Sequence, residues 1–204
     1  MPQITKIYFL KTSSKLLIHS NGTSLFIGDH FYRLIAKQCF KFIFLYPMKK
    51  LLLIRHGEAQ NSAEGGDFYR PLSTRGMADV TRLAQKLEAE GLIPDEIMSS
   101  QALRTTTTAN IIAGQLRLSP AKLSRAIYEA SERTLLNTIN NLNDTIAFAA
   151  IVGHNPGIAY LLLNLTGKIR DVPPGTAITV VFEDADSWQE VSHDSGVITY
   201  YTTP

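Results

Sequence analysis

Short apolar runs alternate with amphipathic stretches from residue 48 almost to the C-terminus. The first run, Leu51 to Ile54, is typical of a buried parallel strand, and a polar loop over 58–70 follows it. Ser73 can then cap a helix over 74–90, because apolar residues recur there at helical spacing and a serine oxygen can accept from a free backbone amide.

The alternation of strands and helices continues along the chain. The pattern predicts strands over 95–99, 122–127 and 146–152, and helices over 101–116, 131–142 and 156–165. We expect Ser100 to cap the first of these three helices. The segments 176–183 and 188–201 predict antiparallel strands at the end of the chain. Successive strand–helix units predict an α/β fold, a three-layer α/β/α sandwich with a largely parallel sheet.

Cationic and titratable side chains follow three of the predicted strands, at the point where each strand ends. Arg55, His56 and Gly57 come directly after the first strand. Arg104 follows the second strand, and His154 follows the fourth. Because open α/β sheets bind ligands at the carboxyl ends of their strands, these side chains can converge on one anion. An arginine can hold a phosphate by two parallel hydrogen bonds, and a neutral imidazole can act as a nucleophile.

Each of these residues also has a plain structural interpretation. Arg55 and His56 could be incidental residues at a strand end, and Arg104 could form a salt bridge on a helix surface. His154 could cap a helix or be satisfied within the core. Their recurrence after successive strands favours a shared site over these separate explanations.

The motifs occur in an order that resembles the histidine phosphatase superfamily, whose fold is phosphoglycerate-mutase-like. Within that superfamily the chain looks most like the small phosphohistidine phosphatases. The matching segments are 53–59, 70–76, 100–109, 128–131 and 152–157. The resemblance covers Met48 to about Val181 and marks 48–204 as the histidine phosphatase domain. Gly57 and Glu58 stand where the small phosphatases often have other residues, which brings this motif closer to the broader superfamily.

The resemblance implies a metal-independent phosphatase that acts through a phosphohistidine intermediate and needs no cofactor. His56 would be the nucleophile. Arg55, Arg104 and His154 would bind the phosphoryl group and stabilise the charge that develops on its oxygens. The sequence has no H-E-x-x-H or EF-hand-like ligand spacing, so we expect no metal site.

Two further residues complete the expected site. Related enzymes place a carboxylic acid near Glu129, so the resemblance favours Glu129 as the general acid. The alternative is that Glu129 only complements a helix dipole. Asn61 could touch the phosphate, and Glu58 could anchor the loop that carries His56.

The length of the domain bears on its substrate. The part after residue 47 has 157 residues, and the segment between His56 and Ser73 is short. It therefore has no room for the long insertions that cover the site in mutase and sugar-bisphosphatase relatives. An exposed, shallow site suits phosphohistidine on a protein, and a small phosphate ester is the alternative within the superfamily. A non-catalytic phosphate-binding regulatory module is the alternative from another class, against which the complete Arg-His-Arg-His set argues.

Residues 1–47 differ in composition from the rest of the chain. They hold six Lys or Arg and one Asp, a net charge of +5, whereas 48–204 hold 14 basic and 17 acidic residues, a net charge of −3. We expect 1–47 to be an atypical basic extension outside the catalytic domain, either poorly ordered or an artefact of start-codon choice. Within it, 4–10 and 15–18 could pair as a hairpin, and 31–44 could form a helix.

Composition also limits the location and the partners. The single cysteine, Cys39, excludes an internal disulfide framework, and residues 1–47 make a poor secretory signal. No run is long enough to span a bilayer, so we expect a cytoplasmic protein, with a monomer favoured. The basic segment lacks a nucleic-acid motif, so nucleic acid is not an expected partner. The expected partners are a phosphorylated protein or a small phosphate ester.

Overall fold

The computed structural model describes residues 7–8, 16–20, 23–27 and 48–204. The chain divides into two units, Met1–Pro47 and Met48–Pro204. In the first unit, β1 (Ile7–Tyr8), β2 (Leu16–Ser20) and β3 (Thr23–Ile27) form an antiparallel sheet. Ile7 pairs with Ile18 across the hairpin that the sequence suggested. The helix suggested over 31–44 lies outside the described residues, and the separate role of 1–47 stays a prediction.

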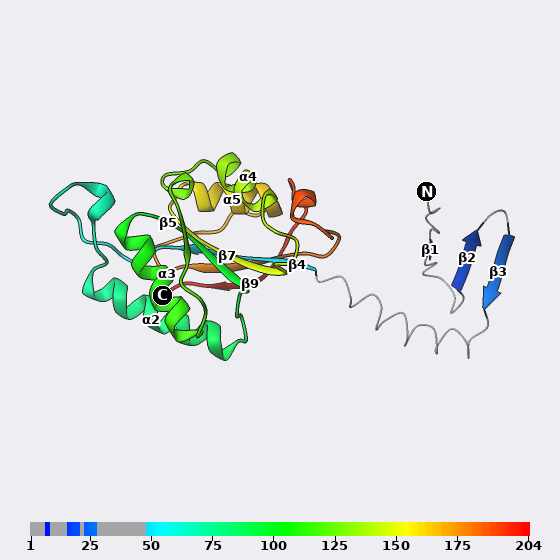
Figure 1. Cartoon of the computed structure of the whole chain (residues 1–204), viewed down its shortest axis with the longest axis horizontal. Helices are drawn as coiled ribbons and strands as arrows, with labels where there is room; N and C mark the ends of the chain where they lie inside the picture. The colour runs from blue at the N-terminus through cyan, green and yellow to red at the C-terminus, as the bar shows by residue number, and fades with distance from the viewer. Residues whose placement is uncertain (1–6, 9–15, 21–22, 28–47) are drawn as a thin grey trace. The chain divides into compact units, whose positions relative to one another are not determined.

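The second unit is built on a six-stranded sheet with the order β6-β5-β7-β4-β8-β9 (Figure 1). Its strands are β4 (Lys49–Arg55), β5 (Glu96–Ser100), β6 (Lys122–Ser124), β7 (Phe148–Gly153), β8 (Ala177–Phe182) and β9 (Val197–Thr202). The four strands from β6 to β4 are parallel, whereas β8 is antiparallel to β4 and β9 to β8. The expected largely parallel sheet is confirmed.

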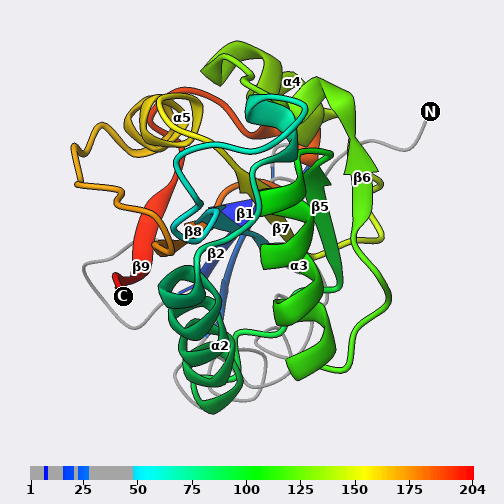
Figure 2. The ribbon, with the colours of Figure 1, turned by 90° about the vertical axis from the view of Figure 1, so that its left-hand side faces the viewer.

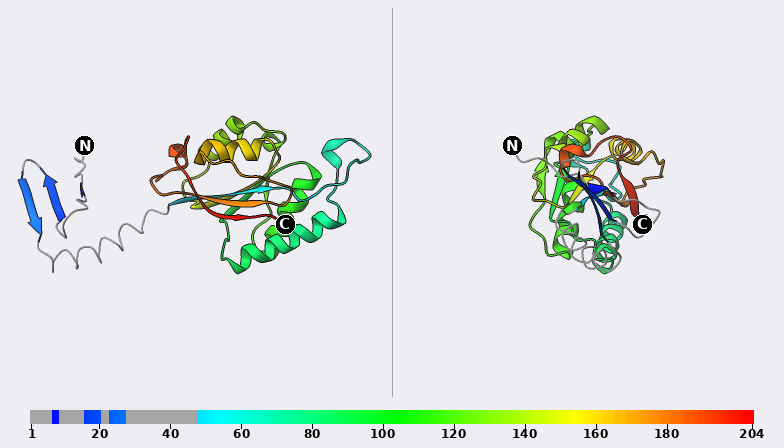
Figure 3. Two further views of the ribbon diagram at one scale, coloured as in Figure 1. Left: turned by 180° about the vertical axis from the view of Figure 1, so that it is seen from behind. Right: turned by 90° about the vertical axis from the view of Figure 1, so that its right-hand side faces the viewer.

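Helices cover both faces of this sheet. They are α2 (Thr74–Ala89), α3 (Leu103–Gln115), α4 (Glu132–Asn140) and α5 (Gly157–Thr166). The helices α2 and α3 lie on one face, and α4 and α5 on the other (Figures 1 and 3). Successive side chains of a strand point to opposite faces, so Leu51 and Leu53 join the core under α4 and α5, whereas Leu52 and Ile54 join the core under α2 and α3. The three-layer α/β/α sandwich is therefore confirmed.

Two of the predicted strands are shorter than expected. The strand predicted over 122–127 ends at Ser124, because a 3₁₀ turn, η2 (Arg125–Ile127), brings Ile127 into the core. The region predicted as a strand from residue 188 begins with a 3₁₀ turn, η3 (Trp188–Glu190), that Ser187 and Glu190 close as a capping box. Only β9, from Val197, is a strand there.

Cationic side chains hold both ends of β4. Lys49 is buried, and its Nζ donates to the carbonyl oxygens of Asp144 at 2.7 Å and Ile146 at 3.2 Å. At the other end, Nη1 of Arg55 donates to the carbonyl oxygen of Val172 at 2.7 Å. These contacts fix the strand that leads directly into His56.

No helix among the described residues combines the length and the apolar character needed to cross a membrane.

Candidate active site

Four residues of the predicted site lie at one edge of the sheet. Arg55 is the last residue of β4, and His56 follows it. Arg104 lies in the first turn of α3, just after β5, and His154 comes directly after β7. Because β5, β7 and β4 are parallel neighbours, their carboxyl ends meet at the edge that faces the viewer in Figure 2. The structure thus brings together the side chains that the strand-end motifs predicted.

The ring of His56 is buried and carries its proton on the nitrogen that points to the backbone. Nδ1 lies 2.7 Å from the carbonyl oxygen of Gly57, which can only accept, so Nδ1 is the donor. Nε2 accepts from Nε of Arg104 at 3.3 Å. Burial, together with the charges of Arg104 and Arg55, lowers the pKa of His56 to about 4 despite the hydrogen bond to Gly57. At neutral pH the ring is therefore uncharged and has a lone pair on Nε2.

The ring of His154 lies beside that of His56, with 5.2 Å between the ring centroids. Its Nδ1 is 3.3 Å from Nη2 of Arg104, and its Nε2 is 2.9 Å from Oγ of Ser100. Because a guanidinium only donates, Nδ1 is the acceptor and Nε2 donates to the serine. Burial and the neighbouring His56 and Arg104 lower the pKa of His154 to about 3.

The prediction that Ser100 caps α3 is wrong. The helix begins at Leu103, and Ala102 is its N-cap residue. Ser100 is instead the last residue of β5, where its Oγ accepts from the amide of Ala102 at 3.3 Å and meets His154. Its hydroxyl therefore positions an imidazole rather than a helix terminus.

Arg104 is almost completely buried and contacts an acidic residue that the sequence prediction did not include. Its Nη1 donates to the carbonyl oxygen of Asp67 at 2.7 Å, and its Nη2 donates to Oδ2 of Asp67 at 2.9 Å. Tyr128 and Arg70 also donate to this carboxylate, at 3.0 Å and 2.8 Å. Asp67 precedes Arg70 by three residues, a spacing suited to an ion pair across one turn, which was the available signal.

Arg55 keeps a donor free beside the two histidines. Its Nη1 shares the carbonyl oxygen of Val172 with Nδ2 of Asn155, which donates at 3.0 Å. Its Nε is buried and has no hydrogen-bond partner within 48–204. A buried, unpaired donor costs free energy, and an anion at this position would satisfy it. Burial lowers the pKa of Arg55 although the charge of Asp171 opposes the shift.

The loop after His56 has no space for larger side chains. The amide of Gly57 donates to Oγ1 of Thr108 at 3.1 Å, and a Cβ on Gly57 would lie 2.6 Å from Val80. The carboxylate of Glu58 accepts from the hydroxyl of Ser73 at 2.7 Å. The same Ser73 hydroxyl accepts from the amide of Gly76 and so caps α2, as predicted. Glu58 therefore anchors the loop to the start of α2.

The other two predicted residues are not part of this network. Glu129 is exposed, has a left-handed backbone with φ of 48°, and forms no hydrogen bond or ion pair within the described part of the chain. Asn61 is also exposed and forms none with described residues. The turn at Glu129 separates Tyr128, which reaches the site, from the start of α4. The geometry gives Glu129 and Asn61 no contact with His56, and their roles stay predictions.

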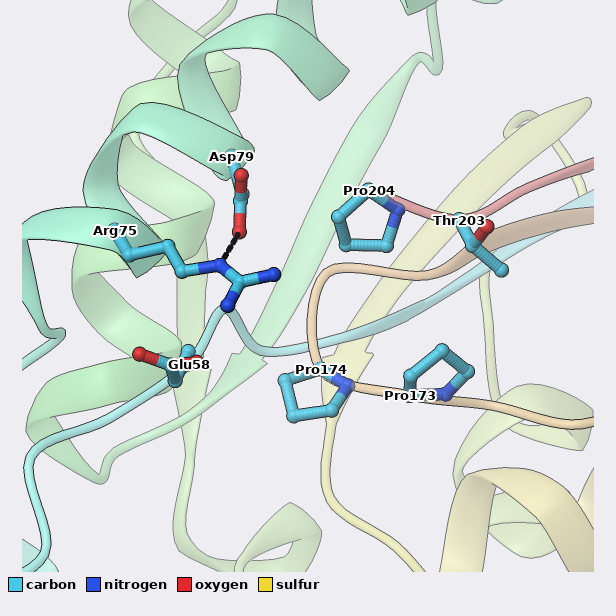
Figure 4. A pocket seen from close by; sticks show the side chains of 7 residues that line it. All are labelled: Glu58, Arg75, Asp79, Pro173, Pro174, Thr203 and Pro204. Atoms are coloured by element: carbon cyan, nitrogen blue, oxygen red, sulfur yellow. Dashed lines mark ion pairs between the residues drawn. The ribbon is translucent and has the colours of Figure 1, made fainter.

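A hollow of about 250 Å³ lies next to the loop but holds none of the four clustered residues. It is lined by Glu58, Arg75, Asp79, Pro173, Pro174, Thr203 and Pro204 (Figure 4). Its charged side chains already have partners, since Arg75 pairs with Asp79 and Glu58 accepts from Ser73. Within the described ranges there is also no group of three or more His, Cys, Asp or Glu residues suited to hold a metal ion.

Comparison with known proteins agrees with this geometry. Residues 51–132 match the model of the histidine phosphatase superfamily (branch 1). An uncharacterized chloroplastic protein of Arabidopsis thaliana is 29% identical over 160 residues, which cover 72% of each chain. The structure of SixA from Agrobacterium tumefaciens has a TM-score of 0.66 and 21% identity, and the match covers 76% of this chain and 98% of that one. The protein histidine phosphatase SixA complexed with tungstate has a TM-score of 0.66, 20% identity, and 76% and 96% coverage.

Fold and site together define an α/β domain whose sheet edge gathers two neutral histidines and two arginines around an anion-sized position. The unit Met48–Pro204 belongs to the histidine phosphatase superfamily and has the fold of the SixA proteins.

Proposed function

We propose that the domain is a phosphatase that removes the phosphoryl group from phosphohistidine on a protein through a covalent intermediate on His56. The observation that carries this proposal is the state of His56, whose Nε2 has no proton and lies among cationic donors. Membership of the superfamily and the fold shared with a protein histidine phosphatase support it.

The geometry suits a two-step displacement. The lone pair of His56 Nε2 would attack phosphorus, the P–N bond of the substrate would break, and the electron pair would leave with the substrate imidazole, which takes up a proton. Water would then attack the phosphoryl group on His56, which releases inorganic phosphate and returns the lone pair to Nε2. Arg55, Arg104 and His154 would hold the phosphoryl oxygens, because such reactions depend chiefly on positioning and charge stabilisation.

The leaving group bears on the need for a general acid. Imidazole is a much better leaving group than an alkoxide, so a phosphohistidine substrate places less demand on Glu129 than a phosphate ester does. The two buried histidines cannot supply this proton at neutral pH, because burial keeps the pKa of both well below 6.5. We propose the same role without a metal ion, in a monomeric cytoplasmic protein, as the composition suggests.

The test is a substrate panel with two histidine variants. We expect para-nitrophenyl phosphate and a phosphohistidine-bearing protein to be hydrolysed, and the protein substrate to be preferred over a phosphoserine peptide and sugar phosphates. His56→Ala should lose turnover, whereas His193→Ala, at an exposed histidine outside the site, should keep it. Quenching without acid should trap an acid-labile phosphoenzyme in the wild type only.

Each part of the proposal has its own contrary result. Preference for a sugar phosphate would move the function to a small-molecule phosphatase. Phosphate binding without turnover of any substrate would indicate a regulatory module instead. Substantial activity in His56→Ala would contradict the covalent mechanism.

A further inference from the structure

The guanidinium of Arg104 is already fully engaged within the protein. Both of its terminal nitrogens donate to Asp67, one to the backbone carbonyl and one to the carboxylate, and Nη2 also meets His154. Its Nε donates to Nε2 of His56. An arginine binds a phosphate through the same fork of donors, so Asp67 holds the face of Arg104 that an oxyanion would need.

The carboxylate of Asp67 acts here as an anion. Although burial opposes the shift, hydrogen bonds from Arg70, Tyr128 and Arg104 lower its pKa to about 2. It is thus negatively charged at neutral pH, and it stands beside the same cation as the expected phosphate. Two anions cannot share the terminal nitrogens of one guanidinium without loss of hydrogen bonds or strong repulsion.

The segment that carries Asp67 is attached to the site by few contacts. We call residues 65–70 the Asp67 segment; it contains a 3₁₀ turn, η1 (Asp67–Tyr69), that has no buried residue. It begins with Gly65 and Gly66, whose φ values of 97° and 93° are open to few other residues. Besides the contacts of Asp67, Phe68 packs edge-on against Tyr128 with 5.0 Å between ring centroids.

The position of the segment fits a competitor of the substrate. It belongs to the teal loop at the left-hand end of the domain in Figure 1, and in Figure 2 this loop passes across the edge of the sheet that carries the site. Because its side chains are not buried, release of the segment would expose little apolar surface. The free energy that opposes release comes mainly from the hydrogen bonds of Asp67.

We propose that Asp67 is an internal anion that occupies the phosphate-binding face of Arg104, and that the phosphoryl group of the substrate must displace it. This inference rests on the proposed function, since it takes Arg104 as a phosphate ligand. Arg55, whose Nε is buried without a partner, is available to the incoming oxyanion before Asp67 leaves. The site therefore selects for phosphoryl groups that compete successfully with a tethered carboxylate.

The test measures tungstate binding by calorimetry on the full chain and four variants. Asp67→Asn keeps the shape and removes the charge, so it should bind tungstate about 5- to 10-fold more tightly, the range expected for a half-exposed ion pair. Asp67→Glu restores the charge and should return affinity toward the wild type. Tyr128→Phe keeps the aromatic contacts, loses one donor to Asp67, and should bind more tightly than the wild type but less than Asp67→Asn.

The matched control is Asp184→Asn, which makes the same change of net charge. Asp184 is exposed and follows the end of β8 that lies opposite the site, so its replacement should leave tungstate affinity within about twofold. Equal or weaker binding by Asp67→Asn would overturn the inference and make Asp67 a residue that positions Arg104. If neither the wild type nor any variant binds tungstate or hydrolyses a phosphate, the proposed function fails as well. If the wild type is active and only Asp67→Asn fails to bind more tightly, the proposed function stands without the competitor.

Discussion

The rings of His56 and His154 lie 5.2 Å apart, and the guanidinium of Arg104 contacts a nitrogen of each. This cation therefore bridges the two imidazoles that face the expected phosphorus position. It also keeps both rings neutral, because its charge lowers the pKa of each histidine in addition to the larger effect of burial. One residue thus sets both the electric field and the protonation state of the site.

Removal of Arg104 should have a large effect on the rate. We expect Arg104→Ala to lower kcat/KM by about 10²- to 10³-fold, the loss typical of one oxyanion-stabilising donor. Arg133→Ala, at an exposed position of α4, is the matched control and should change kcat/KM less than twofold. Steady-state kinetics with para-nitrophenyl phosphate measure both, and a loss below tenfold in Arg104→Ala would argue against its role.

The pH dependence of the rate should reflect the buried histidines. Protonation of His56 would consume the lone pair on Nε2, and its pKa is lowered to about 4. We therefore expect kcat/KM to stay nearly constant from about pH 7 to pH 5 and to fall only as the pH approaches 4. Assays started by a rapid change from neutral pH separate this limb from slow acid unfolding. A half-maximal rate near pH 6.5 would show an ordinary, solvated imidazole instead.

The free energy of unfolding should depend on pH for the same reason. Both folded-state pKa values lie below 6.5, so the unfolded chain takes up protons first as the pH falls. Stability from the neutral rings is fully present above pH 6.5 and is lost as the pH falls from there toward 4. Urea unfolding at about pH 7 and pH 5 should show this loss, and His154→Gln should reduce it. An equal loss in His154→Gln would assign the effect to other groups.

Removal of metal ions should leave the activity intact. Arginine and histidine side chains would supply the positive charge that Mg²⁺ supplies in other phosphoryl-transfer enzymes. We expect turnover after EDTA treatment and desalting to match that of the untreated protein. Loss of turnover that a divalent cation restores would show that the cationic side chains are not sufficient.

Two glycines provide a matched pair for the packing around the loop that carries His56. A Cβ on Gly76 would collide with the backbone of Glu58, whereas Gly114 in α3 has open space around it. We expect Gly76→Ala to cost at least about 1–3 kcal/mol of unfolding free energy and to lower activity. Gly114→Ala should stabilise the fold by about 0.5–1 kcal/mol and leave activity unchanged. Urea unfolding measures both, and equal effects would contradict the close approach at Glu58.

Residues 1–47 should not be required for catalysis. The charge balance changes at residue 48, and the strand–helix pattern begins just after it. A protein that starts at Met48 should fold cooperatively and retain kcat/KM within about twofold of the full chain. Circular dichroism and the phosphatase assay check this. An inactive or insoluble shortened protein beside a well-behaved full chain would show that the first 47 residues complete the fold.

The sequence predicted the sheet and the cluster of charged residues because both depend on local patterns. Buried parallel strands are short apolar runs, and the residues after them reach one edge wherever the strands pair in parallel. Arg55, Arg104 and the two histidines therefore came together without knowledge of the strand order. The strand expected after residue 122 was too long, because its apolar residues also suit a turn that packs Ile127 into the core.

The contacts between loops could not be predicted in the same way. Asp67 lies in a polar loop, and its contact with Arg104 spans 37 residues of sequence and depends on the backbone at Gly65 and Gly66. Ser100 has the residue type of a helix cap, but the chain extends two more residues before α3 starts. Glu129 was placed near the site through the resemblance alone, and the backbone conformation at that position leaves it exposed.

The contacts of Lys49 have a consequence for changes made far from the chemistry. β4 has seven residues, so Lys49 stands about 20 Å from Arg55 along the strand. The strand behaves like a beam clamped at both ends, by Lys49 at one end and by Arg55 at the other. Loosening the far clamp would let the beam slide or tilt, and the imidazole mounted on its tip would lose its aim. Sequence drift on the face of the molecule farthest from the substrate is thus constrained by the accuracy of an attack at the opposite end.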